Sequence, residues 1–132
     1  MNNKIIAVDF DGTLCENKYP EIGAPKYSVI EKLKAEQAAG AKLILWTCRT
    51  EKHLADAVYW CALQGLKFDA INENLKERIE QYGDDTRKIS ATEYWDDRAV
   101  NPLRDYETLK LKQRLEDLKK LLEEIASCIV IE

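Results

Sequence analysis

Two aspartates near the start of the chain, Asp9 and Asp11, have the residue type and spacing that could perform chemistry. They directly follow the apolar run Ile5–Val8, and Gly12 and Thr13 come next. Side chains alternate along a strand, so both carboxylates lean to the same side, and Gly12 permits a sharp turn. Carboxylates at the end of a buried strand must be solvated, paired or bound to a cation. The stretch therefore indicates a site for a hard cation and a phosphate.

A second acidic pair, Asp96 and Asp97, closes the apolar stretch Ile89–Trp95, and Thr47 and Arg49 stand where another apolar run ends. In open α/β sheets, ligands bind at the carboxyl ends of the strands. We therefore expect both acidic pairs and Thr47 to gather at one site, with Arg49 reaching a substrate from its loop.

The hydrophobic pattern predicts strands that alternate with helices, and hence parallel βαβ units with right-handed crossovers. The segment Cys15–Lys26 is expected to be a polar loop, and Ser28 and Glu31 to form a capping box at the start of the first helix. Strands are expected at residues 4–8, 42–47, 68–71 and 89–95, and helices at about 28–39, 50–65, 75–81 and 103–127.

The composition is typical of one globular domain spanning residues 1–132, with 45% hydrophobic and 33% charged residues. A net charge of -4 without a block of one sign gives no indication of nucleic-acid binding by bulk electrostatics. No apolar run approaches the roughly 20 residues that span a bilayer, and no signal peptide is expected before the first strand. The four cysteines form no CxxC pair, so reduced thiols in a cytoplasmic protein are expected.

Four motifs together resemble those of the haloacid dehalogenase superfamily of aspartyl-phosphate phosphohydrolases. The run Asp9-Phe10-Asp11-Gly12-Thr13 is similar to its first motif, D-x-D-G-T, which is the most specific of the four. Thr47 corresponds to the hydroxyl motif, Lys88 to the basic third motif, and Asp96-Asp97 to the acidic fourth. Arg87 adjoins Lys88, so either residue could supply the basic group.

The resemblance implies a Rossmann-like fold with three layers, α/β/α, a parallel sheet of core order 3-2-1-4, and further short strands after Leu14. Members of this superfamily often insert a cap domain after the first or third strand. Here Leu14–Lys42 accommodates one loop and one helix, and Ile71–Lys88 a short helix and a turn. Neither segment can contain a folded cap, so we expect a capless member. Water must then be excluded by Cys15–Lys26, a partner or the substrate.

The activity that the resemblance implies is hydrolysis of a phosphomonoester. Asp9 would be the nucleophile that forms an aspartyl phosphate, and Asp11 would protonate the leaving oxygen and later activate water. The implied cofactor is Mg²⁺, with ligands from Asp9, Asp11 (through its carbonyl) and Asp96, and with Asp97 beside them. The phosphate of the substrate would be held by Gly12, Thr13, Thr47, Arg49 and Lys88.

Two other functions stay open at this point. A phosphorylatable binding module of the response-regulator type also uses acids, threonine and lysine around Mg²⁺. Its phosphoacceptor would follow the third strand, where this chain has Asn72. A catalytically silent scaffold that oligomerises through the C-terminal helix is the other alternative.

The expected helix at 103–127 carries a stripe of apolar residues whose spacings alternate between four and three. This is the a/d pattern of a coiled-coil seam. Such a stripe can cover one face of the sheet, or it can meet a second copy of the chain in a homodimer. The sequence leaves both arrangements open for Leu111, Leu115, Leu118, Leu122 and Ile125.

Overall fold

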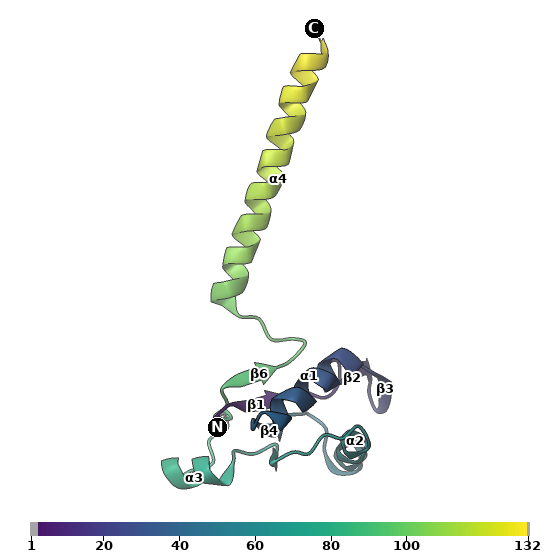
Figure 1. Cartoon of the computed structure of the whole chain (residues 1–132), viewed down its shortest axis with the longest axis vertical. Coiled ribbons are helices and arrows are strands. Elements are labelled where there is room, and N and C mark those ends of the chain that lie inside the picture. Colours follow the sequence, from purple (N-terminus) through teal and green to yellow (C-terminus); the bar gives the residue numbers. More distant parts are fainter. Residues whose placement is uncertain (1–2, 132) are drawn as a thin grey trace. The chain divides into compact units, whose positions relative to one another are not determined.

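The structure, a computed structural model, describes residues 3–131, except for the side chains of residues 103, 104, 106, 130 and 131. The chain divides into two units, Met1–Ala99 and Val100–Glu132. The elements traced in Figure 1 are β1 (Ile5–Val8), β2 (Cys15–Lys18), β3 (Glu21–Pro25), α1 (Tyr27–Ala38), β4 (Lys42–Leu45), α2 (Glu51–Leu63), β5 (Ala70–Ile71), α3 (Lys76–Tyr82), β6 (Glu93–Trp95) and α4 (Pro102–Ile131).

Four strands of the first unit form a parallel sheet in the order β5-β4-β1-β6. Val8, the last residue of β1, lies between Leu45 of β4 and Trp95 of β6. Helices occupy the chain between successive strands of the sheet, because parallel neighbours require a crossover connection. The predicted mixed α/β class with a parallel sheet is confirmed.

The side chains of β1 alternate between two core clusters, as those of a strand buried on both faces must. Ile6 and Val8 belong to the larger cluster, which includes Leu33 of α1 and Cys61 of α2. Ile5 and Ala7 belong to a smaller cluster on the other face. The further members of that smaller cluster are Ile44, Ala70, Leu75 and Ile89.

The segment expected to be a polar loop contains an antiparallel hairpin of β2 and β3. Its turn holds a cis peptide bond between Tyr19 and Pro20. Most of the hairpin side chains are exposed, so the sequence shows no apolar alternation from which a strand could be predicted. The hairpin occupies the place where the resemblance implies short strands.

Two local predictions about the elements are wrong. Helix α1 begins at Tyr27 and makes no side-chain hydrogen bond at its N-cap, so Ser28 does not cap it. Strand β6 begins only at Glu93, since the N–H of Ser90 donates to Asn74 Oδ1 at 2.7 Å rather than to a neighbouring strand.

The second unit consists of α4, which is longer than the expected helix at 103–127. Within residues 3–131, no helix is long and apolar enough to cross a membrane. All four cysteines are free thiols in the structure, and the expectation of a reducing, cytoplasmic environment stays a prediction.

Candidate functional site

The candidate site lies where β1, β4 and β6 end, at the carboxyl edge of the sheet. The N–H of Asp9 donates to Trp95 O at 2.8 Å, and the N–H of Trp46 donates to Val8 O at 2.9 Å. These two bonds extend the pairing of the strands by one residue, to Asp9 after β1 and to Trp46 after β4. The first residue after β1, Asp9, therefore lies beside Asp96, the first residue after β6.

Asp9, Asp96 and Asp97 form an acidic cluster in which one carboxylate oxygen from each residue lies within 4.8 Å of the others. Burial and the negative charge of Asp96 raise the pKa of Asp9 to about 6. Like charges at this distance repel each other until a cation neutralises them. All the donors are hard carboxylate oxygens, the ligands that Mg²⁺ prefers, so the residues present fit the expected cation.

Thr13 connects the two chain segments that carry the acidic cluster. Its hydroxyl donates to Asp9 Oδ2 at 3.3 Å and accepts from the backbone N–H of Asp97 at 3.0 Å. The side chain is only 8% exposed, so it supports the cluster from behind. The hydroxyl of Thr13 is thus engaged twice by the protein, whereas the phosphate contact expected of Thr13 was through its backbone amide.

The backbone amides of Gly12 and Thr13 were also expected to bind the phosphate, and their hydrogen bonds show otherwise. The N–H of Gly12 donates to Cys15 O at 2.9 Å, and that of Thr13 donates to Phe10 O at 3.2 Å. The tight turn after β1 thus satisfies its own donors, as buried backbone groups must. Neither amide is directed at a ligand in this structure.

Gly12 has a steric role at the acidic cluster. Its φ is +91°, and a Cβ built there would lie 2.4 Å from Asp97 Oδ2. Both the backbone conformation and the approach of the carboxylate exclude a larger residue. The glycine of the first motif therefore allows Asp97 to pack against the turn that follows β1.

Gly12→Ala is expected to lower the free energy of unfolding by about 2 kcal/mol, through backbone strain and the displacement of Asp97. Gly83→Ala is the matched control, because Gly83 also has a positive φ of +76° but has nothing within 4 Å of its Cβ position. Denaturant unfolding measures both losses, and that of Gly83→Ala should be nearer 1 kcal/mol, the cost of a left-handed backbone for an L-residue. Equal losses would contradict the steric role of Gly12.

Arg49, expected to reach a substrate, is instead buried and fully hydrogen-bonded. Its side chain donates to both carboxylate oxygens of Asp11, at 2.7 and 2.8 Å. The remaining bonds go to the backbone oxygens of Pro20, Glu21 and His53, at 2.9 to 3.3 Å. A guanidinium has five N–H donors, and these five bonds use all of them. Arg49 is 1% exposed and all its donors are used within the protein, so its role as a phosphate ligand stays a prediction.

The guanidinium of Arg49 also lies between two aromatic rings. Its central carbon is 5.0 Å from the ring centroid of Phe10 and 5.1 Å from that of Tyr19, within the range of cation–π attraction. The hydrogen bond and charge of Asp11 raise the pKa of Arg49 further above its ordinary value. Arg49 thus joins the turn after β1 to the tip of the β2–β3 hairpin.

Asp11 is held away from the acidic cluster by this pairing. Its carboxylate forms a bidentate ion pair with Arg49, the strongest geometry for such a pair. The Asp11 carboxylate is therefore bound by Arg49, whereas the metal contact expected of Asp11 was through its carbonyl. The roles expected for the Asp11 carbonyl and for Asp11 as acid/base stay predictions.

Thr47 lies at the site in a position that agrees with the sequence expectation. Its N–H donates to Asn72 Oδ1 at 2.8 Å, and its hydroxyl accepts from the N–H of Arg49 at 3.1 Å. The hydroxyl hydrogen can still be donated to a ligand. Asn72, at a φ of +54°, positions Thr47 from the end of β5.

A cavity of about 480 Å³ opens over the acidic cluster and collects residues from four segments of the first unit. Five of its residues come from the turn after β1 and the segment after β6, three from the segment after β4, and two from the hairpin. Its lining consists of Asp9, Asp11, Asn17, Tyr19, Thr47, Cys48, Arg49, Asp96, Asp97 and Arg98.

A solved structure that is similar to this chain is that of a conserved protein from Bacteroides thetaiotaomicron. It is 40% identical to this chain, covers 84% of it and 93% of its own length, and superposes with a TM-score of 0.67. The chain belongs to the family of this conserved protein. No protein-family model matches the chain, and no curated protein shows significant similarity to it.

Lys88 lies outside the cavity in this family member. It is exposed, like its neighbour Arg87. Asn74 holds the loop that carries Lys88. The side chain of Asn74 is 3% exposed, and its amide donates to Asp85 Oδ1 and to Thr86 O. The structure therefore does not bring Lys88 to the acidic cluster, and its role as a phosphate ligand stays a prediction.

Two cavity residues, Asn17 and Arg98, were not identified from the sequence. Asn17 belongs to β2, and no motif distinguishes it from other polar residues of the hairpin. Arg98 directly follows the second acidic pair, and its N–H donates to Asp96 Oδ1 at 2.8 Å. A basic residue adjacent to a predicted metal ligand was the available signal for Arg98.

Proposed function

We propose that the chain is a Mg²⁺-dependent phosphohydrolase that acts on phosphomonoesters, with Asp9 as nucleophile and a capless fold of the haloacid dehalogenase type. The observation that carries this proposal is the acidic cluster at the floor of the 480 Å³ cavity. One half-buried carboxylate with a raised pKa stands there beside two exposed ones. The negative charges gathered there attract a cation, which would stabilise the charged form of Asp9.

The arrangement of the sheet supports the proposed fold type. Numbered along the chain, the four strands of the sheet have the order 3-2-1-4 that the resemblance implies. Core clusters on both faces of the sheet are in keeping with three layers. The β2–β3 hairpin reaches the cavity through Asn17 and Tyr19, as expected of a small flap in a protein without a cap.

In the proposed reaction, a carboxylate oxygen of Asp9 attacks phosphorus while the bond to the leaving oxygen breaks. Water then cleaves the resulting aspartyl phosphate and releases inorganic phosphate. Thr13 orients Asp9 by donating to its Oδ2, and the Thr47 hydroxyl can donate to a phosphoryl oxygen. Mg²⁺ held by the acidic cluster would neutralise the charge that opposes the approach of a carboxylate to a phosphate.

A second candidate function is favoured by the ion pair between Asp11 and Arg49. Asp11 must leave Arg49 before it can protonate a leaving oxygen or activate water. If the pair persists, Asp9 could accept a phosphoryl group and keep it. The chain would then be a phosphorylatable binding protein, whose phosphorylated state is long-lived.

One experiment separates these functions. The protein is incubated with a panel of phosphomonoesters and with acetyl phosphate, in Mg²⁺ or in chelator, and released phosphate and protein mass are followed. Repeated Mg²⁺-dependent release supports the phosphohydrolase. A lasting phosphoryl adduct on Asp9 without turnover supports the binding protein. Neither turnover nor adduct under any condition would overturn the proposal.

Mg²⁺ binding is expected to weaken about tenfold between pH 7 and pH 5, because a protonated Asp9 cannot be a ligand. A pKa of about 6 means that Asp9 is mostly charged at pH 7 and mostly neutral at pH 5. Calorimetric titration with Mg²⁺ at both pH values measures the change. Asp96→Asn should abolish binding, whereas Asp56→Asn, an exposed position on α2, should preserve it. An affinity independent of pH would contradict the role of Asp9 as a ligand.

We place this activity in the cytoplasm. Cys48 and Cys128 are exposed free thiols, and a reducing compartment keeps such thiols from oxidation. Cys48 also lines the cavity, where oxidation would alter the site.

A further inference from the structure

The seam of α4, defined as Leu111, Leu115, Leu118, Leu122, Ile125 and Ile129, is an apolar stripe along one face of the helix. Each of these side chains is at least half exposed. A helix of this length owes most of its stability to packing of its apolar face. Apolar residues repeated at spacings of four and three over this many turns need a partner surface of the same length.

The size of the seam is sufficient for a specific interface with another helix. Six leucine or isoleucine side chains that expose roughly 100 Å² each would bury about 600 Å² per helix, or about 1,200 Å² in a pair. This total lies at the lower limit for stable protein–protein interfaces. The seam is therefore large enough for a second copy of α4.

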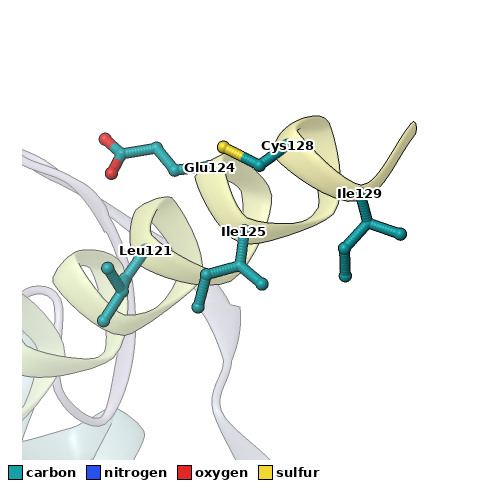
Figure 2. Close-up of a pocket in the computed structure, with 5 residues that line it drawn as sticks. All are labelled: Leu121, Glu124, Ile125, Cys128 and Ile129. Carbon is teal, nitrogen blue, oxygen red and sulfur yellow. The ribbon is translucent and has the colours of Figure 1, made fainter. Parts of the chain in front are cut away.

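The C-terminal half of α4 has a hollow beside the seam. The hollow has a volume of about 390 Å³, and Figure 2 shows the five side chains that line it. Four of the lining residues stand at positions i, i+3, i+4 and i+7 of the helix, and they are Leu121, Glu124, Ile125 and Cys128. The fifth is Ile129, which follows Cys128. Ile125 and Ile129 belong to the seam, so the hollow lies along one edge of it.

The charges along α4 favour an antiparallel partner. Residues 109–120 carry five basic and two acidic side chains, whereas residues 121–132 carry three acidic and no basic ones. In a parallel pair, Arg114 would face the partner's Lys119 on both sides of the seam, and halves of like charge would lie together. An antiparallel pair places the basic half of each helix beside the acidic half of the other, and it also aligns the helix dipoles favourably.

We propose that α4 pairs with α4 of a second copy of this chain as an antiparallel helix pair. One register keeps every seam residue opposite another seam residue. It places Leu118 against the partner's Leu122, Leu115 against the partner's Ile125, and Leu111 against the partner's Ile129. Each copy then contributes six seam residues to the interface, in agreement with the exposed positions.

Light scattering or sedimentation of the full chain over a wide range of concentrations tests the pairing. The wild type is expected to form dimers, and Leu118→Glu should raise the dissociation constant at least a hundredfold, because it puts a charge into the apolar seam. Leu109→Glu is the matched control, since Leu109 is exposed on α4 outside the seam. A wild type that stays monomeric at all concentrations would overturn the proposal and assign the seam to another occupant.

Disulfide crosslinking tests the orientation, in a background where the exposed Cys48 and Cys128 are replaced by serine. Leu111→Cys combined with Ile129→Cys is expected to give covalent dimers under mild oxidation. Leu111→Cys alone should give none, because two such residues would be about 27 Å apart in the antiparallel register. Crosslinking by the single variant would indicate a parallel pair and would overturn the proposed orientation.

Discussion

Asp9→Asn is expected to reduce the hydrolysis of any phosphomonoester substrate at least a thousandfold, because an amide cannot attack phosphorus as a carboxylate does. Asparagine has nearly the same shape and can still accept the hydrogen bond from Thr13. The loss should therefore appear in kcat without loss of the fold. Residual activity near that of the wild type would show that Asp9 is not the nucleophile.

The same substitution is expected to make the metal-free protein more stable at neutral pH. The pKa of Asp9 is raised from 3.8 to about 6, so the folded state binds more protons than the unfolded state between these values. Stability then falls as the pH rises through this window. Asparagine removes that penalty and should contribute roughly 1 kcal/mol at pH 7, a value reduced by solvent screening of the half-exposed group.

Denaturant unfolding in chelator, at pH 7 and near pH 4, measures this effect. The gain from Asp9→Asn should be present at pH 7 and nearly absent near pH 4, where the wild-type carboxyl is neutral. Asp56→Asn, which changes an exposed aspartate on α2, should show neither the gain nor its pH dependence. A variant less stable than wild type at pH 7 would contradict the repulsion inferred within the acidic cluster.

Arg49→Met is expected to lower the free energy of unfolding by about 3 kcal/mol, because it leaves the buried Asp11 carboxylate without its partner. Arg49 is 1% exposed and Asp11 17% exposed in their side chains. The substitution also removes the donors to the backbone oxygens of Pro20 and Glu21. The β2–β3 hairpin should become more susceptible to proteolysis, since Arg49 is what fastens its tip.

The control for Arg49→Met is Arg87→Met, which removes an exposed arginine and should change stability by less than about 0.5 kcal/mol. A double variant with Asp11→Asn isolates the ion pair. Its total loss should be smaller than the sum of the two single losses, because the second change removes the charge that the first left unpaired. Simple additivity would mean that the two side chains do not stabilise each other.

The edge of the sheet at which the site lies was predictable from local pattern alone. Asp9 and Asp96 each follow an apolar strand, and parallel strands bring such residues together whatever the details of the loops. Thr47 reaches the cavity for the same reason. The pairing of the central strands determines where the residues at their ends lie. The strands themselves can be predicted from the hydrophobic pattern of the sequence.

Side chains that bond to distant parts of the chain were not predictable in this way. Arg49 and Thr13 were assigned to the substrate, yet both make their hydrogen bonds to the protein. Their partners lie up to 38 residues away in the chain for Arg49 and 84 for Thr13. No local pattern encodes such a partner, and a buried arginine has the same sequence signature as an exposed one.

The sequence by itself determined the class of fold, the edge of the sheet that carries the site and the acidic residues gathered there. These follow from side-chain alternation and from the carboxyl ends of parallel strands, which are local properties. Only the tertiary structure decided which carboxylates face one another. Asp9 joins Asp96 and Asp97, whereas Asp11 is drawn to Arg49, because a buried guanidinium must be paired with whichever anion the fold brings within reach.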